Sequence, residues 1–150
     1  NMMPSNRPTR AVTASERAAE LIAKLPFAAA HAGHLGLLAT VAAYRDGAPW
    51  LDDVIAVLDH NRALLADLLA AKLPEVAYAP PRAGYLAWLD LRPLDLGEDP
   101  SEALLERGRV ALNAGPTFGP QGRGFARLNI GTSPALVEEA VKRIGEAVGR

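Results

Sequence analysis

The sequence predicts an α+β fold in which helices pack on one side of a small, mainly antiparallel sheet. Between Trp50 and Leu73, apolar residues recur every three or four positions, which is the pattern of one apolar helix face. After Pro74 the period changes to two, which indicates half-buried strands. A helical pattern returns after Ser133. Strands and helices are therefore grouped along the chain as in α+β domains.

The whole chain has the composition of an ordinary globular domain. Its 150 residues are 49% hydrophobic and 22% charged, which is enough for one domain with a real core. Residues 1–12 read as an irregular lead-in, in which Asn1 is interpreted as the remnant of a cleaved tag. We therefore expect a single domain over residues 13–150.

Two helices are expected before Trp50. Thr13, with Glu16 three places later, matches a capping box at the start of an alanine-rich helix that ends at Pro26. The segment 32–47 is apolar almost throughout and predicts a second helix that is largely buried.

The next helix, from Trp50 to Leu73, shows the clearest pattern. Its apolar stripe consists of Leu51, Val54, Ile55, Leu58, Leu65, Leu68 and Leu69. The polar residues off this stripe are Asp52, Asp53, Asp59, Arg62 and Asp67. We expect these polar residues to form a solvated face.

The second half of the chain contains the strands. Segment 76–93 predicts two strands joined by a turn that contains Gly84. Asp99 then caps a short helix, and segment 110–131 predicts a short strand, a glycine-rich loop and another strand. Ser133 begins a terminal helix.

Several classes of function have no support in the sequence. A formal net charge of −1 argues against nucleic acid and anionic membrane as partners, and no apolar run is long enough to span a membrane. The absence of cysteine excludes a disulfide scaffold and suits a cytoplasmic protein. His31 and His34 have no carboxylate nearby to complete a metal site, so no metal is expected.

Arg127 is the residue whose chemistry stands out. On the strand 125–130, Phe125, Arg127 and Asn129 share one face and the alternate residues share the other, which should be the core. A solvated arginine on a strand is common. A guanidinium can also bind a carboxylate through two parallel hydrogen bonds. The residues by themselves leave both interpretations open.

The order of motifs along the chain carries a resemblance. "YLAWLDLR", "RVALNAGPTFG" and "GFARLNIGTSP" occur in that order after the long helix. This arrangement resembles the small, C-terminal domain of pyridoxal-phosphate enzymes of the aspartate aminotransferase superfamily, in the MalY/PatB-like cystathionine β-lyase branch. The resemblance implies that Arg127 binds the substrate's α-carboxylate, and it marks Tyr85 as a weaker candidate for the substrate pocket.

The resemblance also implies what this chain lacks. Enzymes of this family hold pyridoxal phosphate through a lysine and an aspartate of the large domain, which precedes the matched region. The lysines here are Lys24, Lys72 and Lys142, all in predicted helices after the position where the cofactor lysine would stand. We therefore expect no catalytic residue, no cofactor bound to this chain alone, and a large domain or partner subunit as partner, with formation of a homo-oligomer.

Two functional readings follow. In the first, the chain is the small domain of a β-lyase or aminotransferase that acts on sulfur amino acids such as cystathionine. In the alternative, it is a non-enzymatic truncated domain that serves as a binding or assembly module. Lyases and aminotransferases share this architecture, so the fold does not separate their activities.

Overall fold

The computed structural model describes residues 15–24 and 33–150. The chain divides into two compact units, Asn1–Pro49 and Trp50–Arg150. The single domain expected over residues 13–150 stays a prediction. Within the described ranges, no helix is both long enough and apolar enough to cross a membrane.

The first unit contains the helices α1 (Glu16–Ala23) and α2 (His34–Asp46). At the start of α1, the Ser15 hydroxyl accepts a hydrogen bond from the Ala18 amide at 3.2 Å. The expected cap, Thr13, lies outside the described residues.

Helix α2 is exposed along its whole length, so the expectation of a largely buried helix is wrong. Leu35 is 81% exposed, and Leu38 and Val41 are each 53% exposed. An apolar composition predicts burial only if other elements cover the helix. Within the first unit, α2 has no buried residue.

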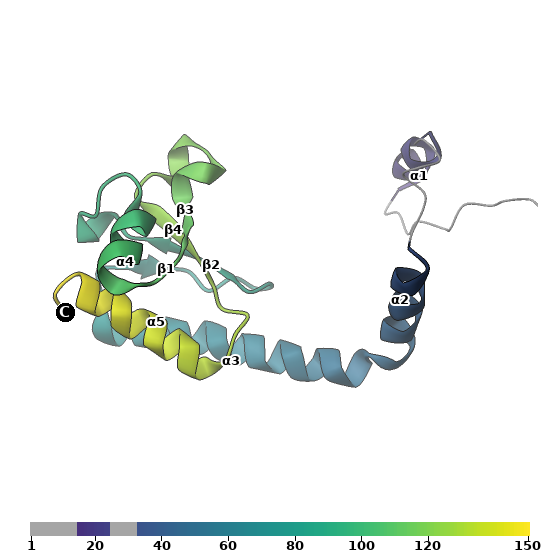
Figure 1. Cartoon of the computed structure of the whole chain (residues 1–150), viewed down its shortest axis with the longest axis horizontal. Coiled ribbons are helices and arrows are strands. Elements are labelled where there is room, and N and C mark those ends of the chain that lie inside the picture. Colours follow the sequence, from purple (N-terminus) through teal and green to yellow (C-terminus); the bar gives the residue numbers. More distant parts are fainter. Residues whose placement is uncertain (1–14, 25–32) are drawn as a thin grey trace, which may run out of the picture. The chain divides into compact units, whose positions relative to one another are not determined.

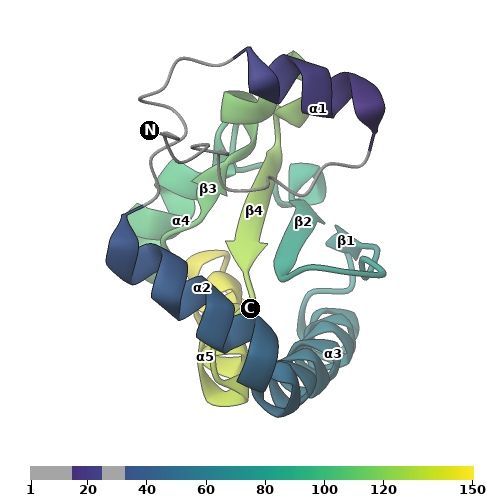
Figure 2. The ribbon, with the colours of Figure 1, turned by 90° about the vertical axis from the view of Figure 1, so that its right-hand side faces the viewer.

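In the second unit, helices pack on one face of a small sheet, as predicted (Figure 1). In chain order its elements are α3 (Ala48–Lys72), β1 (Ala77–Tyr78), β2 (Leu86–Asp90), η2 (Arg92–Leu94), α4 (Pro100–Gly108), β3 (Asn113–Ala114), η3 (Gly115–Phe118), η4 (Pro120–Gly122), β4 (Phe125–Asn129) and α5 (Pro134–Ala147). The strands lie in the order β1–β2–β4–β3, and each neighbouring pair is antiparallel (Figure 2).

The pairing of β2 with β4 sets the two faces of the sheet. Trp88 lies opposite Arg127, and Ala87 lies opposite Leu128. Ala87 and Leu128 face the core, whereas Trp88 is 38% exposed. The predicted alternation on both strands is therefore confirmed.

One hydrophobic cluster joins the covered face of the sheet to α3, α4 and α5. Its buried members are Leu65, Leu69, Leu73, Val76, Ala87, Leu89, Leu91, Leu104, Val110, Ala126, Leu128, Ile130, Val137, Val141 and Ile144. Only the C-terminal half of the predicted α3 stripe belongs to it, because Leu51 and Ile55 are 50% and 45% exposed. The stripe continues beyond the region where the sheet and α5 can cover it.

Two polar residues of α3 are buried among these apolar side chains. Asn61 is fully buried, and its Nδ2 donates to the backbone carbonyls of Ile130 at 2.9 Å and Thr132 at 2.8 Å. These bonds tie the helix to the chain that leaves β4. A buried side-chain amide that makes two such hydrogen bonds fixes the position of the helix relative to that segment.

The expectation that Arg62 lies on a solvated face is wrong. Its side chain is only 11% exposed, donates to the Gly84 carbonyl at 2.5 Å and pairs with Asp59. Burial raises the pKa of the Tyr78 phenol, and the charge of Arg62 opposes part of that rise. An arginine beside an apolar stripe can extend inward when a backbone carbonyl and a carboxylate satisfy it.

The glycine-rich loop before β4 requires glycine at two facing positions. A Cβ on Gly115 would overlap the Gly122 carbonyl, and a Cβ on Gly122 would overlap the Gly115 carbonyl. The two backbones therefore touch directly. This contact folds η3 and η4 together at the end of β3.

We expect replacement of Asn61 by alanine to lower the free energy of unfolding by about 1 to 3 kcal/mol, because one buried and one partly buried carbonyl lose their donor. Chemical denaturation followed by circular dichroism measures this change. Asp67→Ala, at an exposed position of the same helix, is the control and should stay within about 0.5 kcal/mol of the parent. An equal effect of the two substitutions would contradict the tethering role of Asn61.

Candidate functional site

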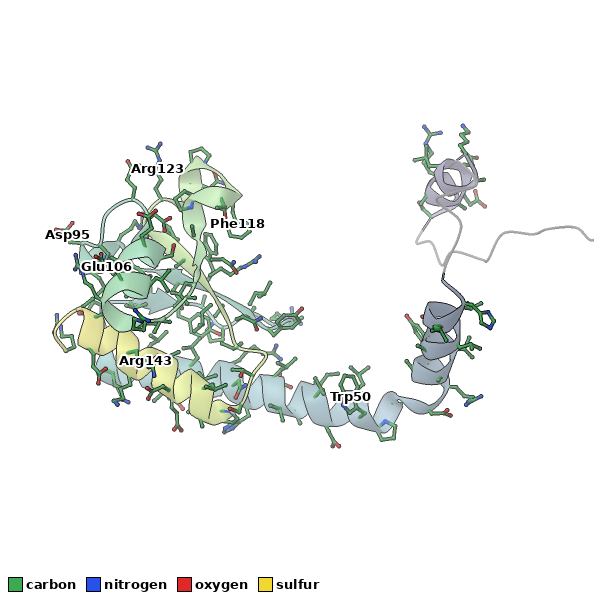
Figure 3. The ribbon with its side chains drawn as sticks, viewed as in Figure 1. Trp50, Asp95, Glu106, Phe118, Arg123 and Arg143 are labelled. Atoms are coloured by element: carbon green, nitrogen blue, oxygen red, sulfur yellow. The ribbon has the colours of Figure 1, made fainter. Side chains whose placement is uncertain are left out.

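The uncovered face of the sheet carries a row of aromatic rings. Phe125 and Trp88 stack with centroids 5.7 Å apart and planes inclined by 16°. Phe118 projects from η3 (Figure 3). Its ring meets Trp88 edge-on at a centroid distance of 5.5 Å. Such contacts hold rings in fixed relative orientations.

An arginine lies over each end of this row. The Arg127 guanidinium carbon is 4.5 Å from the centroid of Phe118. The Arg92 guanidinium carbon is 4.7 Å from the centroid of Phe125. Both contacts are within the range of cation–π attraction. The two cations differ in their remaining partners.

Arg92 is already neutralised. Its Nε and Nη2 donate to the two carboxylate oxygens of Asp90 at 2.8 and 2.6 Å. These hydrogen bonds hold the pKa of the Asp90 carboxyl below its usual range. The carboxylate of Asp90 therefore compensates the charge of Arg92, which weakens its attraction for a further anion.

Arg127 has no carboxylate partner among the described residues. It is half-buried on β4, directly opposite Asn113 of β3. Its Nε and Nη2 donate to the neutral Oδ1 of Asn113 at 3.3 and 3.1 Å. The positive charge is thus held in place without being neutralised, as a receptor for an anion requires.

Tyr85 lies where β2 begins. Its carbonyl accepts a hydrogen bond from the Ile130 amide at 2.9 Å, and the residue is 48% exposed. A Cβ on Gly131 would lie 3.3 Å from the Tyr85 ring, so the ring packs over that glycine. The structure brings Tyr85 to the end of β4, beside Asn129, whose Oδ1 accepts from the Gly131 amide.

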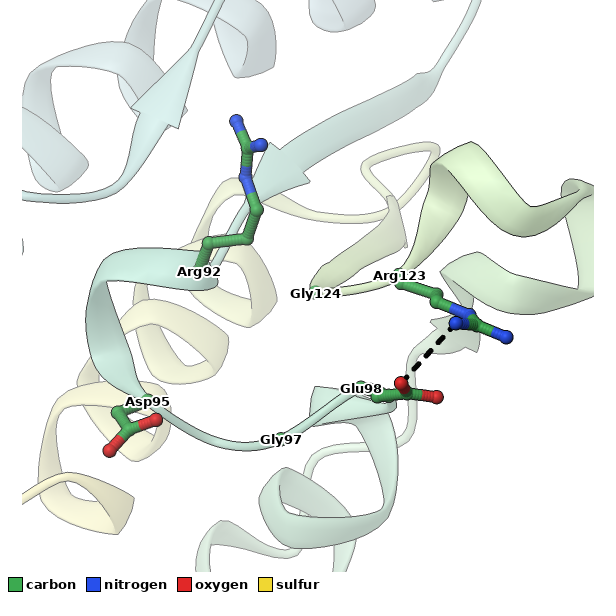
Figure 4. A pocket seen from close by; sticks show the side chains of 6 residues that line it. All are labelled: Arg92, Asp95, Gly97, Glu98, Arg123 and Gly124. Carbon is green, nitrogen blue, oxygen red and sulfur yellow. Dashed lines mark ion pairs between the residues drawn. The ribbon is translucent and has the colours of Figure 1, made fainter.

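Arg127 lines neither of two surface cavities in the second unit. One, of about 310 Å³, is lined by Arg92, Asp95, Gly97, Glu98, Arg123 and Gly124. Within it Arg123 pairs with Glu98 at 3.4 Å, while the Arg92 side chain points away from both (Figure 4). Its cations are therefore already paired.

The other cavity, of about 340 Å³, contains two of the three lysines of the chain. It is lined by Lys72, Val141, Lys142, Gly145, Glu146 and Arg150. Lys142 lies 3.9 and 3.6 Å from two glutamates of α5. Helices α3 and α5, which carry these lysines, pack on the covered face of the sheet, whereas Arg127 lies on the opposite face.

The lysines of the second unit lie away from Arg127. Neither Lys72 nor Lys142 shares a face of the sheet with Arg127, and Lys24 belongs to the other unit. Among the described residues, no cluster of three or more histidine, cysteine, aspartate or glutamate side chains could hold a metal ion.

Sequence reasoning did not single out Asn113 or Phe118. Both lie in the motif "RVALNAGPTFG", but the motif does not say which strand β3 pairs with. That pairing alone puts Asn113 beside Arg127. The alternation of the strand predicted the face on which Arg127 lies. It could have predicted that Asn113 lies beside Arg127 only if the register of β3 with β4 had been known.

Comparisons with known proteins support the resemblance that the order of motifs indicates. No protein-family model matches the chain. A Mycobacterium leprae protein assigned as a cystathionine β-lyase is 40% identical over 152 residues, which are 92% of this chain and 38% of that protein. Protein MalY of Escherichia coli is 43% identical over 115 residues, covering 76% of this chain and 30% of MalY.

A solved structure supports the same resemblance as the sequence comparisons. A Corynebacterium diphtheriae protein, assigned as a pyridoxal-phosphate-dependent β-cystathionase, superimposes with a TM-score of 0.80 at 36% identity over 91% of this chain. By these matches the chain corresponds to part of the MalY-like cystathionine β-lyases. Within these proteins it corresponds to the small α+β domain, and it spans 36% of that solved chain.

Proposed function

We propose that this chain is the substrate-carboxylate-binding domain of a pyridoxal-phosphate-dependent C–S β-lyase or aminotransferase for sulfur amino acids such as cystathionine. The observation that carries the proposal is the un-neutralised guanidinium of Arg127 on the open face of the sheet. When bound, pyridoxal phosphate supplies the electron sink for the reaction at the substrate's α-carbon.

The role of this chain is to bind and orient. Arg127 would hold the α-carboxylate through two charge-assisted hydrogen bonds, and so fix one end of the amino acid. Tyr85, half-exposed at the end of the same strand pair, is proposed as a side wall of the pocket. The lysine and aspartate that hold the cofactor would come from the large domain, so this chain alone is proposed to be inactive.

We expect the chain to bind acetate or a free amino acid at Arg127 with a dissociation constant on the order of millimolar or weaker, because half of the site is open to water. Chemical-shift titration by NMR measures this affinity. Arg127→Lys keeps the charge but loses the fork, and should weaken binding by about tenfold or more.

Arg92→Gln is the matched control for that titration. Arg92 lies on the same face and over a phenylalanine, but its charge is compensated by the carboxylate of Asp90. Its replacement should leave acetate binding unchanged. If Arg92→Gln weakens binding as much as Arg127→Lys, acetate responds to surface charge and the assignment of Arg127 is wrong.

Mixing the chain with pyridoxal phosphate, reducing with borohydride and mapping peptides should show no lysine labelled stoichiometrically. The physical reason is that the second unit provides no lysine on the face that carries Arg127. Stoichiometric labelling of Lys24, Lys72 or Lys142 would show that the chain holds the cofactor by itself.

A specific observation favours assembly with other polypeptides. Apolar side chains of α2 are exposed, including Leu35, Leu38 and Val41. Exposed apolar patches of this kind are typical of surfaces that bind partners. We propose a large domain and a second subunit as those partners. The alternative function, an assembly module, depends on the same exposed surface.

The chain should therefore self-associate in solution, and sedimentation velocity over a range of concentrations measures this. Replacing Leu38 by glutamate puts a charge on the apolar surface of α2 and should shift the distribution toward monomer. Glu20, on α1, offers a control, because its replacement by glutamine changes charge by the same magnitude outside α2. A strictly monomeric parent chain at high concentration would contradict self-association.

A further inference from the structure

The environment of Arg127 fixes one edge of its guanidinium. Asn113 and Arg127 are directly opposed on β3 and β4, so their side chains emerge on the same face. One acceptor, Asn113 Oδ1, bridges two N–H groups, on Nε at 3.3 Å and on Nη2 at 3.1 Å. These two nitrogens form the side-on edge of the fork.

The environment of Arg127 also fixes one flat side of its guanidinium. The Phe118 ring lies under the group at 4.5 Å, and Trp88 supports Phe118 edge-on. Trp88 in turn stacks on Phe125, a residue of the same strand as Arg127. The platform under the guanidinium is thus connected to the sheet on which Arg127 stands.

These contacts leave the other edge of the fork available. A guanidinium has five N–H groups, and two of them meet Asn113. Both N–H groups of Nη1 and the second N–H of Nη2 have no acceptor among the described residues. They form the end-on edge, which can receive a carboxylate through two parallel hydrogen bonds.

The chemistry of Asn113 suits this arrangement. An amide oxygen accepts hydrogen bonds without neutralising the cation, so the attraction for an incoming anion is kept. Arg92 shows the contrast on the same face, because the carboxylate of Asp90 accepts from its Nε and Nη2 and also compensates its charge. Ordering a long arginine side chain before the ligand arrives also removes part of the entropic cost of binding.

We propose that Asn113 and Phe118 are positioning residues that pre-orient Arg127, so that a carboxylate ligand is received end-on at Nη1 and Nη2. This inference rests on the proposed role of Arg127 as carboxylate ligand. It adds the direction of approach and identifies the residues that set it.

The direct test is the rotation about the Nε–Cζ bond of Arg127, measured by NMR on the full chain with labelled arginine. In the parent, rotation should be slow. In Asn113→Ala and in Phe118→Ala it should become faster. Arg92 provides a control within each sample, because Asp90 should keep its rotation slow in every variant.

The second measurement is acetate titration of the same variants. Asn113→Ala should weaken binding by about three- to tenfold through lost pre-ordering. Asn113→Asp should keep Arg127 rotation slow but weaken acetate binding by about tenfold or more, because an internal carboxylate would neutralise the fork. If Asn113 had a merely structural role, Asn113→Asp would not keep the rotation of Arg127 slow while it weakens acetate binding.

The outcomes distinguish this inference from the proposed function. Fast rotation of Arg127 in the parent, or unchanged rotation in Asn113→Ala, overturns the positioning role whatever acetate does. Slow rotation in the parent that Asn113→Ala accelerates, combined with no acetate binding at Arg127, overturns the proposed function instead.

Discussion

The candidate site depends on the antiparallel pairing of β2 with β4. This pairing places Trp88 opposite Arg127 and brings the Tyr85 carbonyl to the Ile130 amide. A shift by one residue would exchange the two faces, moving Arg127 into the core and Leu128 out of it. The burial of Ala87 and Leu128 on the covered face therefore secures the position of the guanidinium on the open face.

Helix α3 holds one end of this strand pair, where β2 begins and β4 ends, through two adjacent polar residues. Asn61 binds the chain that leaves β4, and Arg62 binds the Gly84 carbonyl just before β2. Apolar packing is not directional, so it could not by itself fix the two loops to within a hydrogen-bond length. The buried polar contacts supply that direction, while the surrounding leucines supply most of the stabilisation.

The open face of the sheet combines features that globular domains usually cover. Trp88 and Phe118 are 38% and 44% exposed, and Arg127, which has no carboxylate partner among the described residues, lies over Phe118. An aromatic and cationic surface of this kind suits contact with an anion and with another polypeptide. This agrees with a domain whose relatives are more than twice as long.

The sequence by itself determined the elements and the alternation of the strands, because hydrophobic period and turn residues act locally. It identified Arg127 as an outward-facing residue for that reason. Only the tertiary structure decided that Asn61 and Arg62 are buried, that half of the α3 stripe and all of α2 are exposed, and that Asn113 and Phe118 contact Arg127. Each of these depends on which distant segment lies alongside, and local periodicity carries no information about that choice.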